Sequence, residues 1–243
     1  MLPWQRPDPP DRLRTLRETS LPKLVRDDLL DAILQGRLQP GDRINEPDVC
    51  QRLQVSRVPV REALRELESS GLVVSRKHAG VFVRQIEAGE VRELYELRSV
   101  LDGHAGARVA ALPAAERKVL AQALQASIAR MHEACARQEV PRYYAENLNF
   151  HWLILSATGN QTLCATYQSH IQRLHLARLQ TLSQDVGMQR SIAEHERIAS
   201  AIAQGDAALA GQLLTDHVNG AHQRLVHRPP ISPTSKETSH EKT

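Results

Sequence analysis

The sequence predicts a mainly α-helical protein in two unlike parts, a winged helix-turn-helix followed by an all-α antiparallel bundle of six to seven helices. Three observations lead to this prediction. Two short amphipathic segments and two β-prone runs lie close together before residue 84. Every segment after residue 89 repeats its apolar residues at helical spacing. Aromatic residues make up only 3% of the chain, so the core must rest on Leu, Ile, Val and Ala.

The first helical segment runs from about residue 21 to residue 35, and Gly36 ends it. Pro40 and Gly41 then form a turn into a short strand at residues 43–44. The apolar stripe of this helix consists of Val25, Leu29, Ile33 and Leu34.

The next two segments form a helix pair joined by a tight turn. Residues 45–53 read as a short helix with Asn45 as its cap, and the second helix lies within residues 55–72. Ser56 stands at the N-cap of the second helix, and Gly71 follows its last apolar turn. This is the helix-turn-helix plan, in which the second helix enters the major groove of DNA. Its inner face consists of Val60, Ala63, Leu64 and Leu67.

Basic side chains concentrate on this part of the chain. Arg57 and Arg61 are four residues apart, so they share an exposed face near the start of the second helix. Forked guanidinium groups in that position suit phosphates and guanine edges. Residues 51–84 carry seven Lys and Arg against three Glu, a net charge of +4, whereas the whole chain carries only +3.

Two β-prone runs follow the helix pair and predict a hairpin. Residues 73–74 and 81–83 flank the segment 76–80, which contains Arg76, Lys77, His78, Ala79 and Gly80. We interpret this hairpin as a wing with a basic tip.

The run ILQGRLQPGDRINEPDVCQRLQVSRVPVREALRELESSGLVVSRKHAGVFV resembles the winged helix-turn-helix of the GntR family of bacterial transcription regulators. The L-x-PG-D/E turn, the VSR-x-PVREAL helix and the wing glycine carry the resemblance, which extends over some sixty residues without a gap. It implies binding to a double-stranded, palindromic DNA operator. The DNA-binding residues that we expect are Arg43, Ser56, Arg57, Val58, Arg61, Lys77, His78 and Gly80.

Length and composition predict an ordinary globular protein. We expect a flexible arm at 1–19, a winged domain at 20–84, a linker at 85–89, a helical domain at 90–227 and a disordered tail at 228–243. Three scattered cysteines without a CxxC motif favour a reduced compartment. No apolar run approaches the length of a membrane span, and no export signal is visible, so we expect a cytoplasmic protein without a membrane partner.

Prolines and glycines divide the second part into six helices with short connections, which favours an antiparallel bundle. The predicted helices are residues 90–112, 114–138, 141–158, 161–182, 188–204 and 206–226.

Three of the eleven histidines follow the apolar stripes of separate helices and therefore point into the bundle. These are His151, His195 and His217. Buried imidazoles need partners, and a shared metal ion would satisfy all three. The alternative is that each is a core histidine with a local hydrogen bond. The other histidines of this part show no such pattern and are interpreted as surface or packing residues.

The segment from about residue 90 to residue 226 resembles the all-helical FCD effector domain of the FadR-type GntR subgroup. The matching pieces are LYELRSVLDGHAGARVAA, N-x-x-FH-x-x-L-x-x-x-x-GN and EH-x-x-I-x-x-AI-x-x-GD. The resemblance implies a divalent metal, with zinc preferred and nickel or manganese as alternatives. Asn147 replaces an Asp that many members have, and an amide oxygen binds metal more weakly than a carboxylate. The implied ligands are Asn147, His151, His195 and His217.

An open coordination position would accept a small organic acid, and Arg98 could bind its carboxylate. The sequence therefore predicts a metabolite-responsive transcription regulator, a repressor, acting as a homodimer. The alternative is a metal-dependent hydrolase that uses the histidine-rich site. No HExxH motif is present, and a hydrolase has no use for a basic winged domain. A third interpretation, an architectural DNA-binding protein without a ligand, does not explain the inward histidines.

Overall fold

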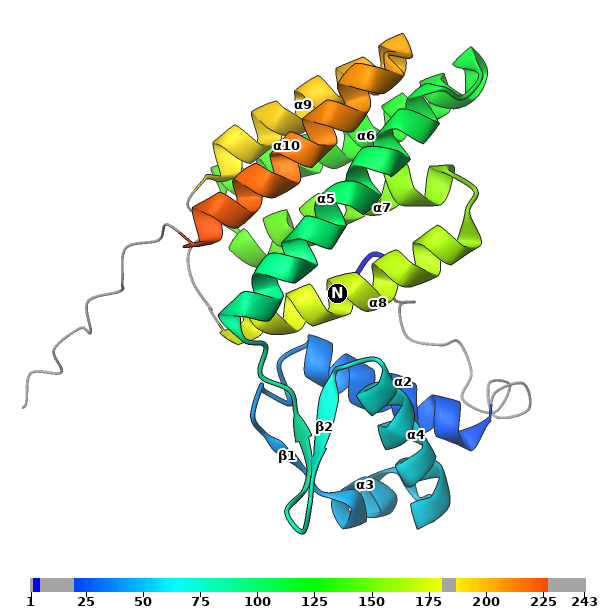
Figure 1. The fold of residues 1–243 in the computed structure, drawn as a ribbon, viewed down its shortest axis with the longest axis vertical. Coiled ribbons are helices and arrows are strands. Elements are labelled where there is room, and N and C mark those ends of the chain that lie inside the picture. The colour runs from blue at the N-terminus through cyan, green and yellow to red at the C-terminus, as the bar shows by residue number, and fades with distance from the viewer. Residues whose placement is uncertain (1, 5–19, 181–186, 227–243) are drawn as a thin grey trace, which may run out of the picture.

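The computed structural model describes residues 2–4, 20–180 and 187–226 of the chain. These residues form a small winged domain and a larger helical bundle stacked on it (Figure 1). Most of the predicted arm and the predicted tail lie outside the described residues. Of the arm, Leu2 is buried, and the ring of Trp4 lies 5.0 Å from that of Trp152, centroid to centroid.

The winged domain contains a helix pair and a three-stranded antiparallel sheet in the order β1-β3-β2. Across the hairpin, Arg76 pairs with Gly80, so these two residues of the predicted tip belong to the strands and the tip is limited to residues 77–79. The apolar stripes predicted for the first helix and the recognition helix are fully buried and form the core of the domain. The elements are α2 (Leu21–Leu34), β1 (Arg43–Ile44), α3 (Glu46–Leu53), α4 (Arg57–Ser69), β2 (Val73–Arg76) and β3 (Gly80–Val83).

Local backbone chemistry sets the bounds of α4. Gln54 adopts a left-handed conformation, with φ of 55°, and this single residue turns the chain between α3 and α4. Ser56 occupies the N-cap position with an extended backbone, as predicted, although its side chain makes no cap hydrogen bond. Gly71, with φ of 72°, follows the end of the helix.

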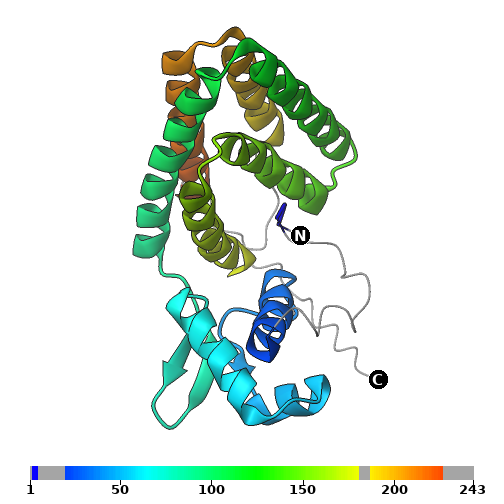
Figure 2. The same ribbon diagram turned by 90° about the vertical axis from the view of Figure 1, so that its right-hand side faces the viewer.

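The bundle consists of long helices that run back and forth with short connections, as the two views in Figures 1 and 2 show. Their described ends lie within about two residues of the predicted ones, which is the usual spread for helix boundaries. No helix in the described ranges is long and apolar enough to cross a membrane. The helices are α5 (Ala88–Ala110), α6 (Ala114–Ala136), α7 (Val140–Ala157), α8 (Gln161–Gln180), α9 (Met188–Gln204) and α10 (Ala207–Val226).

Glycines bring α5 and α10 into close contact. A Cβ atom at Gly106 would lie 2.3 Å from Cδ1 of Leu214 and 3.0 Å from the carbonyl oxygen of Ala210. A Cβ atom at Gly103 would lie 2.3 Å from Oγ1 of Thr215. Any larger residue at either glycine would therefore push the two helices apart.

Helix α8 connects the bundle to the winged domain. The Nε2 atom of His175 donates a hydrogen bond to the carbonyl oxygen of Leu34, at the end of α2, over 2.9 Å. Glu90, at the start of α5, accepts hydrogen bonds from Arg84 of the winged domain and from Arg173 of α8. The two domains are thus joined by polar contacts beside the short chain connection.

The α5–α10 contact predicts a stability effect. Replacing Gly106 by Val should lower the free energy of unfolding by about 1–3 kcal/mol, because the added methyl groups overpack a buried contact. Gly89 is the matched control, since it lies on the same helix and a Cβ atom there would have no neighbour within 4 Å. Urea unfolding followed by circular dichroism measures both. Equal stability of Gly106→Val and Gly89→Val would contradict the tight contact.

Candidate metal centre and nucleic-acid interface

The start of α4 presents its polar and apolar groups to solvent together. Ser56, Arg57, Val58 and Arg61 are all exposed, and the Val58 side chain is 64% exposed although it is apolar. The Nε atom of Arg61 lies 3.0 Å from a carboxylate oxygen of Glu46, an exposed ion pair that water and salt weaken. An exposed valine between two arginines can contact a thymine methyl group while the guanidiniums reach phosphates or guanine.

The hairpin places the remaining predicted DNA-binding residues at one edge of the same domain. Lys77 and His78 are exposed at the tip, and His78 adopts a left-handed backbone with φ of 60°. Gly80 has φ of 104°, and a Cβ atom there would lie 3.1 Å from Nε of Arg43. Gly80 therefore allows both the turn and the close passage of Arg43. In Figure 1 the hairpin tip and α3 lie at the end of the winged domain farthest from the bundle.

The three histidines predicted to point inward meet in the bundle core. His151 comes from α7, His195 from α9 and His217 from α10, and their exposed fractions are 0%, 0% and 4%. One ring nitrogen from each lies within 4.8 Å of the others. Three imidazoles on separate helices at this spacing are the nitrogen donors that zinc and other late divalent metals prefer.

Two of these rings are each hydrogen-bonded to a carboxylate through Nδ1. The Nδ1 atom of His151 lies 2.9 Å from Oδ1 of Asp102 on α5. The Nδ1 atom of His217 lies 2.7 Å from Oε2 of Glu194 on α9. Carboxylates that hold histidines in this way commonly orient metal ligands in proteins.

These hydrogen bonds decide the tautomers. An ionised carboxylate only accepts, so Nδ1 of His151 and of His217 must donate, and Nε2 of each neutral ring keeps a lone pair. The two Nε2 atoms nevertheless lie 3.3 Å apart. Two lone pairs at this distance repel unless a proton or a cation lies between them. The geometry therefore fits a cation at this point.

His195 and Asn147 also fit a bound cation. Within the described part of the chain, neither ring nitrogen of His195 has a hydrogen-bond partner, and neither does the buried Oδ1 atom of Asn147. Leaving such groups unsatisfied costs about 1–3 kcal/mol each, so buried polar groups without partners are uncommon. A divalent ion would satisfy imidazole nitrogens and an amide oxygen alike.

The protonation states suit metal binding. Burial lowers the pKa of His151 to about 4 and lowers the pKa of His195 and of His217 as well, so all three rings are neutral at pH 7. Burial opposes ionisation of Glu194, but hydrogen bonds from His217 and Arg224 outweigh it and lower its pKa to about 2. Neutral imidazole is the form that binds a metal ion.

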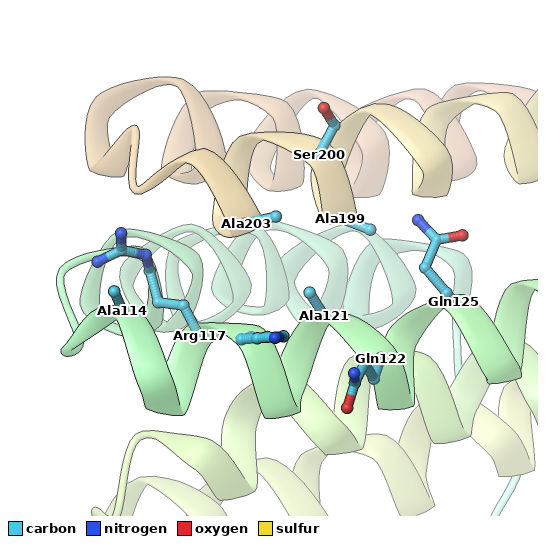
Figure 3. A pocket seen from close by; sticks show the side chains of 9 residues that line it. Ala114, Arg117, Ala121, Gln122, Gln125, Ala199, Ser200 and Ala203 are labelled. Carbon is cyan, nitrogen blue, oxygen red and sulfur yellow. The ribbon is translucent and has the colours of Figure 1, made fainter.

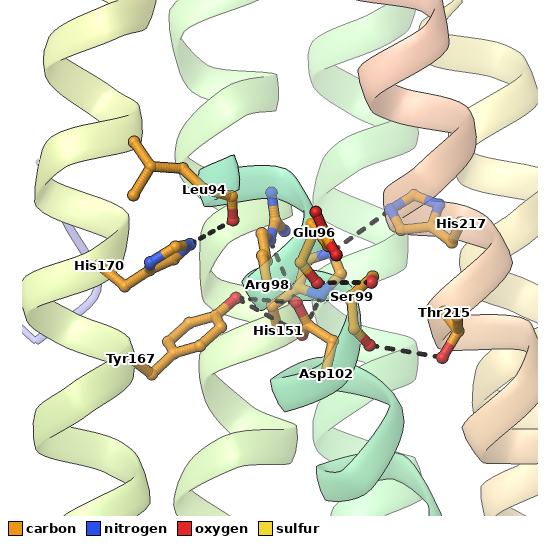
Figure 4. A network of polar contacts seen from close by, with 10 residues as sticks. All are labelled: Leu94, Glu96, Arg98, Ser99, Asp102, His151, Tyr167, His170, Thr215 and His217. Atoms are coloured by element: carbon orange, nitrogen blue, oxygen red, sulfur yellow. Dashed lines mark hydrogen bonds and ion pairs between the residues drawn. The ribbon is translucent and has the colours of Figure 1, made fainter. Parts of the chain in front are cut away.

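Arg98 lies in the same network but is not free. Its side chain is buried, and its Nε atom donates to Oδ2 of Asp102 over 3.1 Å (Figure 4). The hydroxyl group of Tyr167, on α8, lies 3.5 Å from both oxygens of Asp102. Burial would raise the pKa of Asp102, but His151 and Arg98 outweigh it and hold that pKa below its ordinary value. Arg98 and His151 are thus linked through one carboxylate.

Sequence reasoning does not identify Asp102 or Glu194 as partners of the histidines. Glu194 precedes His195 in the chain, but its carboxylate holds His217 on the neighbouring helix. Asp102 lies four residues after Arg98 on the inner face of α5. An acidic residue on an apolar helix face is the only signal that could have pointed to it.

Two surface grooves lie elsewhere in the bundle. One, of about 660 Å³, runs between α6 and α9 and is lined by four alanines and five polar or charged residues, among them Arg117 and Lys118 on α6 (Figure 3). The other, between α6 and α7, is apolar and includes Val119. Neither is lined by any of the predicted metal ligands or by Arg98.

Comparison with known proteins agrees with this arrangement. Residues 93–220 match the FCD domain, and residues 22–83 match the bacterial regulatory proteins of the gntR family. The chain is 32% identical over 206 residues to a probable D-xylose utilization operon transcriptional repressor of Paenarthrobacter nicotinovorans, covering 84% of this chain and 88% of that relative.

Two solved structures show the same fold. A GntR-type transcriptional regulator of Rhodococcus sp. RHA1 has a TM-score of 0.73 at 27% identity, covering 87% of this chain and all of the other. The E. coli protein McbR/YncC has a TM-score of 0.70 at 20% identity, covering 86% and 98% of the two chains, and supports the fold alone.

The buried network predicts a large stability effect at Asp102. Replacing Asp102 by Ala should cost about 3–5 kcal/mol, because it leaves the charge of Arg98 buried without its partner. Glu196→Ala is the matched control, since Glu196 pairs with His132 over 3.0 Å at an exposed site and should cost less than about 1 kcal/mol. Chemical unfolding with a chelator present excludes any contribution from metal. Similar losses in the two variants would contradict a structural role for Asp102.

Proposed function

Because the chain belongs to the gntR family of bacterial regulatory proteins and carries an FCD domain, we propose that it regulates transcription in response to a small organic acid, which binds beside a divalent metal in the bundle. The family establishes the coarser function, a DNA-binding transcription regulator rather than an enzyme. The named relative is a probable repressor, which supports repression as the direction here.

The proposal for DNA rests on the exposed N-terminal half of α4. Arg57 and Arg61 would contact phosphates and guanine edges, and Val58 a thymine methyl group. The wing would contact the neighbouring sugar-phosphate backbone of the DNA through Arg43, Lys77, His78 and Gly80. Two copies of the chain, related by two-fold symmetry, would read the halves of a palindromic operator.

The proposal for the metal rests on one observation, the convergence of three neutral imidazoles with unsatisfied or opposed nitrogen atoms. His151, His195 and His217 would hold the ion, with Asn147 as an oxygen ligand. Zinc is the first choice and nickel or manganese the alternatives, because imidazole suits zinc and nickel while the amide oxygen admits harder ions. When bound, such an ion supplies a Lewis-acidic position that attracts a carboxylate.

Arg98 is the proposed second anchor for the acid. Its guanidinium group would bind a ligand carboxylate, for which Arg is well suited. Arg98 already shares Asp102 with His151, so a ligand at Arg98 would act directly on the carboxylate that orients a metal ligand. This link supports a site in which metal and effector depend on each other.

Helix α8 offers a route from this site to DNA binding. Tyr167 contacts Asp102 on one part of α8, and His175 contacts the end of α2 on another. A change in the position of Asp102 would therefore be transmitted to α8, the helix that also contacts the winged domain. We propose that the effector alters the position of the winged domain through α8.

For DNA binding, Arg57→Ala should weaken operator affinity by about 1–3 kcal/mol if the side chain contacts a base. Arg137→Ala, an exposed arginine on the bundle, is the control and should bind normally. Fluorescence anisotropy with a promoter fragment at fixed salt measures both. Normal binding by a folded Arg57→Ala variant would show that α4 is not the recognition helix.

For the metal, elemental analysis should find one divalent ion per chain, and a chelator should lower the melting temperature, since the ion binds only the native state. His195→Ala should lose the ion and the response of DNA binding to added organic acids, yet keep DNA binding without acid. His132→Ala, an exposed histidine on α6, should change none of these. If the wild-type chain contained no stoichiometric metal and the chelator left its melting curve unchanged, these histidines would be ordinary core residues.

A further inference from the structure

The side chains proposed to hold the metal ion are all electrically neutral. His151, His195 and His217 are uncharged at pH 7, because burial lowers the pKa of each ring. Asn147 lies four residues before His151 on α7, so the two side chains lie on the same face of that helix. The amide oxygen of Asn147 carries no formal charge either. A divalent ion held by these four side chains therefore keeps both of its positive charges.

The two carboxylates bonded to the histidines do not offset that charge. Asp102 is paired with Arg98, whose Nε atom lies 3.1 Å from its Oδ2 atom (Figure 4). Glu194 is paired with Arg224, whose two terminal nitrogens lie 3.2 Å from its two oxygens. Each carboxylate and its arginine sum to zero. Neither pair has a negative charge left over for an ion.

The other acidic residues close to these ligands in sequence are engaged elsewhere. Glu146 is paired with Arg130 on α6 over 2.8 Å. Glu196 is paired with His132 over 3.0 Å at an exposed site, and Asp216 is exposed. Along the described parts of α7, α9 and α10, only Glu194 is a carboxylate bonded to one of the three histidines. The charge of an ion must therefore be balanced from outside the chain.

An ion with two uncompensated charges is unfavourable at this position, because burial removes its hydration. We propose that the site takes a dicarboxylate, and that the divalent ion and the dianion bind together, each raising the affinity for the other. This inference rests on the metal of the proposed function and names the class of acid that binds beside it. One carboxylate of the acid would lie at the ion and the other at Arg98.

Charge balance separates the dicarboxylate from other small metabolites. A neutral ligand, such as a sugar, would leave both charges of the ion uncompensated. A monocarboxylate would leave one. A dianion brings the sum over the ion, the ligand and the two carboxylate–arginine pairs to zero.

Zinc uptake in the presence of different anions tests the coupling. The intact chain is dialysed against buffers of fixed free zinc that contain malonate, succinate, glutarate, acetate or no organic anion, at equal ionic strength. At least one of the three dicarboxylates should lower the free zinc concentration for half-occupancy by tenfold or more, and acetate should lower it much less. Elemental analysis measures the zinc per chain. Because free zinc is fixed, zinc bound by the anions in solution does not affect the result.

One added negative charge should change the preferred anion. Asn147→Asp should take up zinc at least tenfold more tightly without any organic anion, because its carboxylate replaces a neutral donor. Acetate should then increase zinc uptake about as much as the best dicarboxylate does. Asn219→Asp is the matched control, the same exchange at an exposed position of α10, and should behave as the wild type does. Circular dichroism verifies that both variants are folded.

The outcomes separate the dicarboxylate from the metal itself. A wild-type chain that takes up no zinc with any of these anions overturns the metal of the proposed function and this inference together. Equal zinc uptake with and without the organic anions overturns the coupling and leaves the metal standing. If acetate were as effective as the dicarboxylates on the wild type, one charge would suffice and the dicarboxylate would be wrong. An Asn147→Asp chain that kept the preference for a dicarboxylate would contradict the charge balance.

Discussion

The arrangement of the bundle depends on the buried carboxylate of Asp102. It receives contacts from Arg98 on its own helix, His151 on α7 and Tyr167 on α8. A charge in the interior is stable only with such partners, because burial removes its hydration. His151 and Tyr167 thereby hold α7 and α8 in defined positions beside α5, while Arg98 neutralises the carboxylate from within α5.

A second carboxylate extends this arrangement to the other helices. Glu194 on α9 holds His217 on α10, and Arg224 neutralises it from the same helix as His217. The close approach of α10 to α5 at Gly103 and Gly106 then brings His217 within 3.3 Å of His151. Small residues at one contact thus decide the distance between two imidazoles on different helices.

The winged domain is stabilised differently from the bundle. Its core is apolar, and its charges remain on the surface, where α4 and the hairpin present them to solvent. The two domains meet at α8, through the bond from His175 to Leu34, and at the start of α5, where Glu90 pairs with Arg84 and also with Arg173 of α8. The buried polar network of the bundle is thereby connected to the basic winged domain through these two helices.

The sequence by itself determined the helices, the hairpin and the inward direction of His151, His195 and His217, because apolar periodicity and turn residues act within a few positions of the chain. It also indicated Ser56 as the cap of α4 and the basic face at Arg57 and Arg61. Only the tertiary structure decided that Asp102 and Glu194 hold two of the histidines and that Arg98 is already paired. The two histidine–carboxylate contacts join residues 49 and 23 positions apart in the chain, and the Arg98–Asp102 pair lies on the buried face of α5. No local sequence pattern therefore specifies these contacts. They follow from how the helices pack.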